Sequence, residues 1–454
     1  MRRVLVANRG EIALRIVRAA HDVGLEAVAV HSTADASAPH VRLADHAVEI
    51  GPAPASKSYL DVDALLDAAR ASEADAVHPG YGFLSERESF AQAVEDAGLV
   101  FVGPAPGHIA LMGDKARARE TARAAGVPTI PGSDGAVDDA GAAVAVAEEI
   151  GYPVALKAAG GGGGRGIRIA EDFEAVRSGF AVASREAGGA FDDPRLYVER
   201  FVSPARHVEV QVLGDGTAAV HLFERECSLQ RRRQKIVEES PAPHLPDAVR
   251  GGLCEAAVAL CREVGYRSAG TVEFLVDADT DEFFFIEMNT RIQVEHPVSE
   301  LVTGIDLVAE QLRIAGGEPL GIEQDAVTAR GCALELRVNA EDPEQGFVPS
   351  PGPITRLVLP SGPWVRLDTW LEPGAEVPPF YDSLLAKLIV WGPDRATAVR
   401  RTRRALAELE IEGVSTTAPL LATLLDEDWF AAGDFHTGTL EAWLGQRHEE
   451  ASRS

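Results

Sequence analysis

The sequence predicts a mixed α/β and α+β fold, with a parallel sheet first and a strand-rich segment last. In residues 1–112, short apolar runs alternate with amphipathic helical patterns, which indicates a parallel α/β sheet. Between residues 113 and 327, several strand patterns are separated by short polar turns, as in hairpins. From about residue 328 strands dominate until helices close the chain. We therefore expect domains at 1–112, 113–327 and 328–446, followed by a polar tail at 447–454, and fraying after Gly445.

The composition is that of an acidic globular protein of 454 residues, a length at which two or three packed units are expected. Apolar residues make up 46% and charged residues 25%, and the formal net charge is −27. This charge argues against nucleic acid or an anionic membrane as the main partner, although a locally basic site could still bind an anionic substrate. The four cysteines form no CxxC pair, and neither a signal peptide nor a membrane span is apparent. We expect reduced thiols in a cytoplasmic protein.

The first domain shows the alternation most clearly. We expect helices at 11–23 and 90–97 and strands at 4–7, 27–31, 76–78 and 99–102. The turn at residues 8–11 lacks the GxGxxG fingerprint, so a dinucleotide site is not expected there. Residues 75–85 end a strand in a loop rich in glycine and proline, where such sheets bind ligands, although an ordinary loop has the same composition.

The second domain contains a glycine run between two strands. We expect helices at 113–125 and 140–150, strands at 153–157 and 167–170, and a further helix capped by Glu171 or Asp172. The run, residues 160–166, precedes no helix and no Gly-Lys-Ser/Thr sequence, so it is neither a dinucleotide fingerprint nor a P-loop. It is typical of a hairpin whose backbone N–H groups approach phosphate. Lys157 and Arg165 at its ends favour that interpretation over a flexible linker.

Lysine is rare in this chain: among 43 basic residues, only Lys57, Lys115, Lys157, Lys235 and Lys387 are lysines. Where arginine is so strongly preferred, a retained lysine suggests a need for a compact ammonium, unless it persists by chance. Lys235 lies in a cation-dense segment, residues 227–241, which follows strands at 196–199, 207–213 and 219–225. Arginine runs usually mark a solvated face or a nucleic-acid patch, but with this net charge we favour anion capture in a cleft.

Two strands at 270–276 and 283–288, joined by an acidic turn, predict a hairpin that brings Glu273 close to Glu287. With Asn289, these carboxylates are hard oxygen ligands suited to Mg²⁺ or Mn²⁺ bound to nucleotide phosphates. The alternative is a carboxylate pair in solvent, but like charges that face each other are unfavourable without a cation.

From residue 287 to residue 295 every second residue is polar: Glu287, Asn289, Arg291, Gln293 and Glu295. In an extended chain alternate side chains share a face, so we expect these five groups in one row. A solvated strand has the same pattern, but the preceding run 283–286 is strongly apolar and indicates burial. Arg291 and Gln293 could hold a small planar oxyanion, and Glu295 could take a proton from it as a general base.

The last domain is predicted to contain strands at 333–338 and 386–391, loops at 349–353 and 378–383, and helices at 396–409, 418–425 and 437–444. Arg337 lies in the first of these strands. A glycine flap, spaced lysines, paired carboxylates and an anion pocket beside an acid are together the equipment for ATP-driven activation of a carboxylate-like substrate.

The motifs, taken in order, resemble those of biotin carboxylase over roughly residues 3–445. The matching segments are 7–15, 78–86, 112–115, 160–166, 230–239, 285–297 and 381–383. The resemblance implies an ATP-grasp fold in which the nucleotide lies between a core sheet and a mobile lid at about residues 131–203. It also implies a reaction in which bicarbonate attacks the γ-phosphate of ATP. The resulting carboxyphosphate releases CO₂ and phosphate, and N1′ of biotin is then carboxylated.

The resemblance assigns site residues by position. It places ATP at Lys115, Lys157, Gly163, Gly164, Glu199, Phe201, Val202, His207 and Arg233, and the metal at Glu273, Glu287 and Asn289. It places bicarbonate at Lys235, Arg291, Gln293 and the Val294 backbone, the base at Glu295, and the residue that steadies the enolate-like form of biotin at Arg337. Arg233 stands where the family often has His, and Arg200 occupies an adenine-side position that can be Lys. We take Cys227 as structural.

No Met-Lys-Met segment for biotin attachment is present, so the resemblance implies a separate biotin carboxyl carrier protein and a carboxyltransferase. The chain then resembles the carboxylase subunit of an acyl-CoA carboxylase, with acetyl-CoA as the expected acceptor. A homodimer is implied, with Arg18, Asp22 and Arg366 at its interface.

Two alternatives remain open. Another ATP-grasp ligase, of the carbamoyl-phosphate or purine-pathway type, would release ADP without biotin. A non-catalytic nucleotide-binding regulatory protein should lack at least one of four residues that are all present, namely Lys235, Glu287, Arg291 and Glu295.

Overall fold

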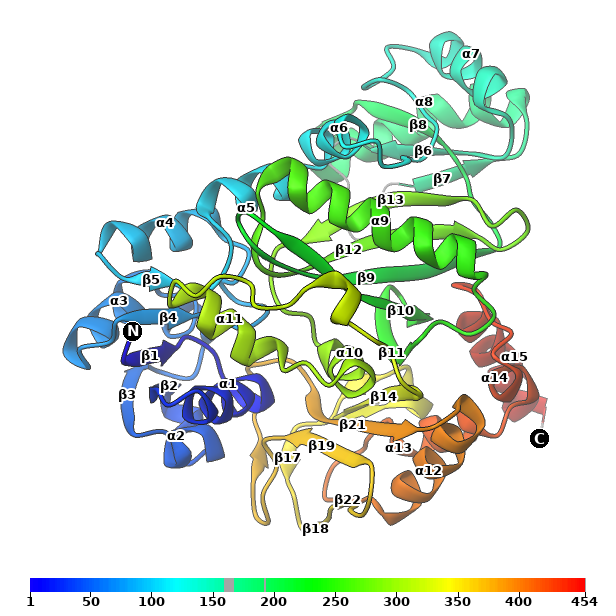
Figure 1. Ribbon diagram of the computed structural model, residues 1–454. Coiled ribbons are helices and arrows are strands. Elements are labelled where there is room, and N and C mark those ends of the chain that lie inside the picture. Colours follow the sequence, from blue (N-terminus) through cyan, green and yellow to red (C-terminus); the bar gives the residue numbers. More distant parts are fainter. Residues whose placement is uncertain (159–166, 192, 454) are drawn as a thin grey trace.

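The computed structural model describes residues 1–158, 167–191 and 193–453. The chain begins with a five-stranded parallel sheet of order β3-β2-β1-β4-β5, drawn in blue in Figure 1. Its strands are β1 (Arg3–Val6), β2 (Glu26–Ser32), β3 (His46–Gly51), β4 (Ala76–His78) and β5 (Val100–Phe101). The helices between them are α1 (Gly10–Asp22), α2 (Pro39–Leu43), α3 (Val62–Ala71) and α4 (Glu88–Asp96). The predicted parallel α/β domain is confirmed.

Both faces of this sheet are buried, which explains why its strands are continuous apolar runs. Val4 and Val6 share one apolar cluster with helix α1 and with α11 (Leu307–Ala315). Leu5, between them, points to the opposite face and packs with residues of α3 and α4. Because the strands are parallel, the turns that follow β1 and β4 lie at the same, carboxyl edge of the sheet, where ligands bind.

An eight-stranded antiparallel sheet forms the centre of the molecule, with the order β13-β12-β9-β10-β11-β14-β21-β19. Its strands are β9 (Ala205–Asp215), β10 (Ala219–Arg231), β11 (Gln234–Ser240), β12 (Arg267–Asp277), β13 (Phe283–Asn289), β14 (Cys332–Asn339), β19 (Val365–Thr369) and β21 (Leu384–Gly392). Helices α9 (Asp247–Val264), α10 (His296–Thr303) and α11 pack against it (Figure 1). Because β11 pairs with β14, the sheet runs without interruption from the central segment into the C-terminal one.

A small unit stands apart at the top of Figure 1. Its three-stranded antiparallel sheet has the order β7-β6-β8, and two helices pack on it. The elements are α7 (Ala140–Ile150), β6 (Val154–Ala158), β7 (Ile167–Ala170), α8 (Phe173–Phe191) and β8 (Leu196–Arg200). Helices α5 (Pro106–Gly113) and α6 (Lys115–Ala124) connect it to the N-terminal sheet. Since β6 pairs with β7 in antiparallel register, the glycine run does join two neighbouring strands; Gly163 and Gly164 themselves lie outside the described residues.

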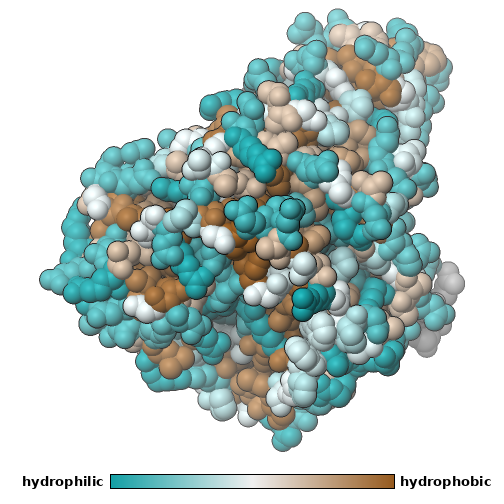
Figure 2. Space-filling model, in the orientation of Figure 1, coloured by the Kyte–Doolittle hydropathy of each residue, from teal (hydrophilic) through white to brown (hydrophobic). Residues whose placement is uncertain are grey.

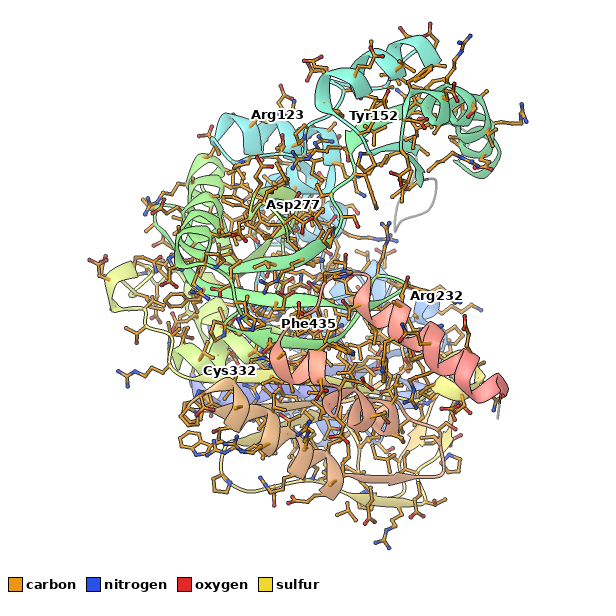
Figure 3. All side chains as sticks on the ribbon, turned by 90° about the vertical axis from the view of Figure 1, so that its right-hand side faces the viewer. Arg123, Tyr152, Arg232, Asp277, Cys332 and Phe435 are labelled. Carbon is orange, nitrogen blue, oxygen red and sulfur yellow. The ribbon has the colours of Figure 1, made fainter. Side chains whose placement is uncertain are left out.

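The views from two sides agree on where this unit lies. The face shown in Figure 2 is mostly hydrophilic, with apolar residues in small groups, and it is notched on the right between the small unit and the body. Figure 3, turned by 90°, places Tyr152 in the small unit and Arg232 in the body below it. In the described part of the chain, no helix has both the length and the apolar character needed to cross a bilayer.

The C-terminal segment adds short strands and four helices. The strands are β15 (Glu341–Asp342), β16 (Val348–Pro349), β17 (Gly352–Pro353), β18 (Arg356–Val358), β20 (Glu376–Val377) and β22 (Glu410–Glu412), so the predicted loop at 349–353 includes parts of two strands. The helices are α12 (Arg395–Glu408), α13 (Ala418–Leu425), α14 (Asp428–Ala432) and α15 (Thr439–Arg453). Helix α15 continues past Gly445 to Arg453, and Leu440 and Trp443 anchor its first turns; fraying after Gly445 stays a prediction.

A histidine at the end of β4 makes acid stability testable. His78 is fully buried and accepts a hydrogen bond at Nδ1 from the Gly80 backbone N–H (3.0 Å). Burial lowers the pKa of His78 to about 3. In the unfolded chain this imidazole is protonated below about pH 6.5, whereas in the folded chain it stays neutral. The free energy of unfolding therefore falls as the pH drops below about 6.5.

We expect His78→Asn, which keeps an acceptor but does not ionise, to remove about 2 kcal/mol of the stability that wild type loses between pH 7.5 and pH 5. Urea unfolding across this pH range measures it, with the exposed His46→Asn as control. Parallel curves for wild type and His78→Asn would contradict the assignment.

Candidate active site

One cavity of about 1990 Å³ lies between the small unit, the central sheet, the turns of the N-terminal sheet and the loop before β21. Every predicted site residue in the described part of the chain lines it: Lys115, Lys157, Glu199, Phe201, Val202, His207, Arg233, Lys235, Glu273, Glu287, Asn289, Arg291, Gln293, Val294, Glu295 and Arg337. Tyr81 to Phe83, from the predicted ligand loop after β4, line it as well. Residues from three separate segments of the sequence thus meet in a single space.

The row of five polar residues is not one continuous strand. Strand β13 ends at Asn289, residues 290–295 form an irregular turn, and helix α10 begins at His296. Pro297 occupies the first turn of α10, a position that favours helix initiation over strand continuation. The turn still brings the side chains together, because Arg291 donates to Asn289 Oδ1 (3.2 Å) and to Gln293 Oε1 (2.6 Å).

The predicted carboxylate hairpin is confirmed by the strand register. Glu287 on β13 lies directly opposite Glu273 on β12. The same row continues through Glu209 on β9 to Arg225 on β10. In-register residues point to the same face of a sheet, so three carboxylates line up with an arginine at the end of the row.

The two carboxylates among the three predicted metal ligands differ in their surroundings. Burial raises the pKa of Glu287 and the charge of Glu273 raises it further, while Lys115 opposes both. Burial would also raise the pKa of Glu273, but Lys235 and His207 lower it far below its usual range. Asn289 donates to Glu273 Oε1 (2.8 Å). In the described structure Glu287 has no hydrogen-bond or ion-pair partner, so a bound cation would relieve the repulsion between the two carboxylates and supply the missing contact.

Lys235 is the shared partner of three carboxylates in the cavity region. From β11 its Nζ reaches Glu209 Oε2 (2.5 Å), Glu273 Oε1 (3.2 Å) and Glu295 Oε1 (2.6 Å). Burial would lower the pKa of Lys235, but the facing carboxylates raise it well above its ordinary value, so the ammonium persists at neutral pH. Loss of this cation would leave each of the three buried carboxylates with one charged partner fewer.

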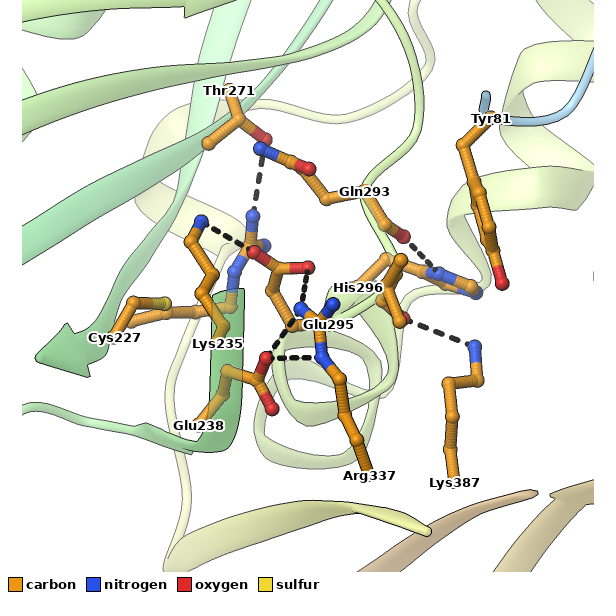
Figure 4. Close-up of polar contacts among 12 residues, drawn as sticks. Tyr81, Cys227, Lys235, Glu238, Thr271, Gln293, Glu295, His296, Arg337 and Lys387 are labelled. Atoms are coloured by element: carbon orange, nitrogen blue, oxygen red, sulfur yellow. Dashed lines mark hydrogen bonds and ion pairs between the residues drawn. The ribbon is translucent and has the colours of Figure 1, made fainter. Parts of the chain in front are cut away.

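Glu295 lies between two cations (Figure 4). Its Oε1 accepts from Lys235 and its Oε2 from Arg337 (2.9 Å). Burial would raise the pKa of Glu295, but Lys235 and Arg337 hold it well below its ordinary value. In this arrangement Glu295 is a weak base, and it gains basicity only when another group takes those donors away.

Arg337 is itself held by a carboxylate that the sequence did not single out. Its Nε donates to Glu238 Oε1 (2.6 Å), and Glu238 is fully buried on β11. Burial raises the pKa of Glu238 to about 7, against the opposing effect of Arg337. Arg337 therefore stands with its guanidinium fixed between Glu238 and Glu295 (Figure 4).

A second cluster of charged residues lies where the small unit borders the cavity. Lys157 and Arg119 both donate to Glu199. Burial would raise the pKa of Glu199, but these two cations lower it. His207 lies between Gln230 (2.8 Å at Nδ1) and Glu273 (3.0 Å at Nε2). Burial would lower the pKa of His207, but Glu273 raises it.

The cation-dense segment is a hairpin with an exposed tip. Strand β10 ends at Arg231, and Arg232 and Arg233 form a two-residue turn with φ of 47° and 68° before β11 begins. Arg232, Arg233 and Lys235 line the cavity, whereas Arg231 turns away and donates to the Gly346 carbonyl (3.0 Å). Three of these cations thus line the cavity, and anion capture there stays a prediction.

Two further residues of this region carry a local signal in the sequence, and a third does not. Glu209 alternates with His207 and Gln211 in one strand, the same period-two signal used for residues 287–295. Arg119 lies four residues after Lys115, hence on the same face of helix α6. Arg225 gives no local signal: it is fully buried and donates to Glu209, Gln211, Thr271 and Ser299 at 2.6 to 3.0 Å.

Fold and site together define a class of protein. The cavity lies between an antiparallel sheet and a small three-stranded unit, with lysines on one side and paired carboxylates on the other. This arrangement is typical of an ATP-grasp ligase.

Comparisons with known proteins narrow this class to a family. The model of the biotin carboxylase N-terminal domain matches residues 1–109 and that of the biotin carboxylase C-terminal domain matches residues 335–442. Between them, residues 114–323 match the ATP-binding domain of the carbamoyl-phosphate synthase L chain. A biotin carboxylase of Pseudomonas aeruginosa is 51% identical over 447 residues, covering 98% of this chain and 99% of that protein.

Solved structures agree with the sequences. The biotin carboxylase domain dimer of Hydrogenobacter thermophilus 2-oxoglutarate carboxylase, in complex with MgADP, ADP and bicarbonate, has a TM-score of 0.88 and 47% identity, covering 97% of both chains. The complex of Campylobacter jejuni biotin carboxylase with a β,γ-ATP ligand has a TM-score of 0.90 and 44% identity, covering 97% of this chain and 98% of that one.

The chain therefore belongs to the biotin carboxylase family, which is a family of ATP-dependent ligases. This confirms the predicted family, fold class and type of enzyme.

Proposed function

We propose that this protein carboxylates biotin on a separate carrier protein, with ATP and bicarbonate as substrates and carboxyphosphate as the intermediate. The observation that carries the proposal is the single cavity in which the carboxylate pair Glu273–Glu287 lies beside the set Arg291–Gln293–Glu295. The carboxylate pair could bind a metal ion that also contacts nucleotide phosphates. The second set could bind a small oxyanion next to an acidic side chain.

ATP is proposed to enter beneath the small unit. Lys115 and Lys157 would neutralise its phosphates, with Glu199, Phe201, Val202 and His207 around the rest of the nucleotide. Glu273, Glu287 and Asn289 would hold Mg²⁺ or Mn²⁺, which neutralises the charge that builds up on the phosphate oxygens when it is bound. Contacts from Gly163, Gly164 and Arg233 to the nucleotide stay predictions.

Bicarbonate is proposed to bind to Lys235, Arg291, Gln293 and the Val294 backbone. When the anion takes hydrogen bonds from Lys235, Glu295 loses part of the interaction that lowers its pKa, and it becomes able to accept the bicarbonate proton. The anion then attacks the γ-phosphorus, the bond to ADP breaks, and carboxyphosphate releases CO₂ next to biotin. Arg337 would steady the enolate-like biotin whose N1′ attacks the CO₂, and the departing phosphate takes the N1′ proton.

The test is ADP release by the purified chain. We expect release that requires bicarbonate and that free biotin stimulates. Release that ignores biotin would favour another ligase of the same class, of the kind named by the family model over residues 114–323. A regulatory protein without catalysis would bind ATP and release no ADP.

We further propose that the chain works as the carboxylase subunit of an acyl-CoA carboxylase in the cytoplasm, with acetyl-CoA as the acceptor. A biotin carboxyl carrier protein and a carboxyltransferase would be its partners. A homodimer is supported by the H. thermophilus relative, described as a dimer. Of the expected interface residues, Arg18 and Asp22 are exposed on α1, whereas Arg366 donates to Glu300 and Asp368 of its own chain. Purification with bound partners, followed by identification of the biotinylated one, tests this proposal.

The metal site gives a separate prediction. In Glu287→Gln one ligand charge is lost, so we expect Mn²⁺ to bind in the presence of ATP about 10-fold more weakly or worse, in the range of losses seen when a site's ligand sphere is disturbed. The metal-free variant should melt at a higher temperature than wild type, because the repulsion that raises the pKa of Glu287 is gone.

Electron paramagnetic resonance of Mn²⁺ and thermal melting without metal provide the two measurements. Asp279→Asn, an exposed residue of the turn between β12 and β13, is the control. Unchanged Mn²⁺ binding in Glu287→Gln would remove Glu287 from the metal site.

A further inference from the structure

The turn that carries Gln293 and Glu295 is held from below by side chains instead of by a ladder of backbone hydrogen bonds. Its successive carbonyls each have a side-chain donor. Arg291 reaches the Ile292 carbonyl (3.2 Å), and His296 Nδ1 lies 2.7 Å from the Gln293 carbonyl. The Val294 carbonyl accepts from Lys387 Nζ at 3.0 Å.

Lys387 differs from the other two donors because it comes from a different part of the chain. It lies in the middle of β21, 93 residues away in sequence, whereas Arg291 belongs to the turn itself and His296 follows it directly as the first residue of α10. Figure 4 shows it below the turn, on the side away from Lys235. The bond therefore links the C-terminal segment to the proposed bicarbonate site.

The ammonium of Lys387 is completely shielded from solvent. Its other neighbours are Glu11 Oε2 on α1, at 3.1 Å, and Asp368 Oδ2 on β19, at 3.7 Å. Burial would lower the pKa of Lys387, but Glu11, Glu335 and Asp368 raise it. Asp368 already accepts two hydrogen bonds from Arg366 (2.9 and 2.7 Å), which leaves Glu11 as the main counter-charge.

A charged donor at this point controls the geometry of the site. The peptide group between Val294 and Glu295 is planar, so a fixed carbonyl also fixes the direction in which the chain enters Glu295. An arginine would bring a larger planar fork into a space bounded by three oxygen atoms, which gives a physical reason for lysine in a chain that otherwise prefers arginine.

We propose that Lys387 is a positioning residue for the bicarbonate half of the site: it holds the Val294 carbonyl and thereby sets where Gln293 and Glu295 meet the anion. This inference rests on the proposed function, since it assumes that bicarbonate binds at this turn. It predicts that loss of Lys387 acts on bicarbonate and leaves ATP binding intact, because the nucleotide wall is built from other strands.

The experiment uses the full chain and two variants. Lys387→Met alone leaves Glu11 buried without its cation, with only the Tyr81 hydroxyl as a donor, and risks misfolding. Lys387→Met/Glu11→Gln has the same net charge as wild type and avoids that risk. Glu11→Gln alone is the matched control, because it keeps the bond from Lys387 to Val294. Steady-state ADP release and thermal melting are measured for each.

For the double variant we expect the KM for bicarbonate to rise about 10- to 100-fold, the loss that corresponds to one hydrogen bond from a charged donor. The KM for MgATP should stay within about twofold, and the Glu11→Gln control should keep its KM for bicarbonate within about threefold. A double variant with an unchanged KM for bicarbonate would overturn the inference, and so would a parallel rise of both KM values. If wild type released no ADP in response to bicarbonate, the proposed function would fail first, and this inference with it.

Discussion

Replacing Glu295 by alanine should abolish the stimulation of ADP release by biotin and lower the rate of biotin carboxylation about 10²- to 10⁴-fold, the range that a general base contributes. The side chain is almost fully buried between Lys235 and Arg337. In the described structure no other carboxylate bonds to both cations. Removing it takes away the proton acceptor and leaves Arg337 with Glu238 as its remaining partner.

Glu295→Gln separates the charge from the shape. The amide keeps an acceptor for Arg337 but cannot take a proton, so it should be as inactive as the alanine variant while melting closer to wild type. Glu318→Ala, an exposed carboxylate after α11, should behave as wild type. ADP release measured with and without biotin provides the comparison. If Glu295→Ala kept biotin stimulation within about tenfold of wild type, Glu295 would not be the base.

Replacing Lys235 by methionine should have the largest effect on both activity and stability. It removes the one cation that Glu209, Glu273 and Glu295 share. Loss of one partner from a buried ion pair costs about 3–5 kcal/mol, so we expect a free energy of unfolding lower by at least this much at pH 8. We also expect ADP release below one hundredth of the wild-type rate, because the proposed bicarbonate site loses its ammonium.

The stability loss of Lys235→Met should depend on pH in a defined direction. Without the ammonium, Glu273 and Glu295 lose a cation that lowers their pKa, and burial then favours their protonated forms. The variant therefore regains stability as the pH falls and these carboxylates take up protons. Urea unfolding at pH 8 and pH 5.5 should therefore show the gap to wild type narrowing at the lower pH. Lys57→Met, at an exposed lysine, is the control. A gap that stayed constant would mean that the carboxylates are not what destabilises the variant.

Regular elements were predictable where a local signal marks them. The strands at 76–78 and 167–170 and the helices at 140–150 and 418–425 have the predicted bounds. Apolar periodicity and local capping carry such information: Asp139, for example, accepts a hydrogen bond from the Ala142 backbone N–H (2.9 Å) at the start of α7.

Elements with disturbed patterns were not predictable. Helix α9 contains Gly251 and Gly252, which weaken its helical signal, and the structure compensates by packing Leu253, Cys254 and Ala257 into the core. Strand β10 runs on to Arg231 although its register with β11 shifts between Glu226 and Gln230, so its apolar alternation is lost. The turn at 290–295 kept a strand-like alternation of residues after the strand itself had ended.

The sequence alone determined the family and the candidate site residues that line the cavity, because motifs and side-chain periods are local properties that can be read within about ten residues. It also placed Glu273 opposite Glu287, since one hairpin sets that register. Only the tertiary structure decided that Glu209 and Arg225 continue the same row, that Glu238 holds Arg337, and that Lys387 donates to the Val294 carbonyl. These contacts join strands that are far apart in the chain. Such partners depend on the order and register of the whole sheet and on the packing of the N-terminal helix against it, for which no short stretch of sequence contains a signal.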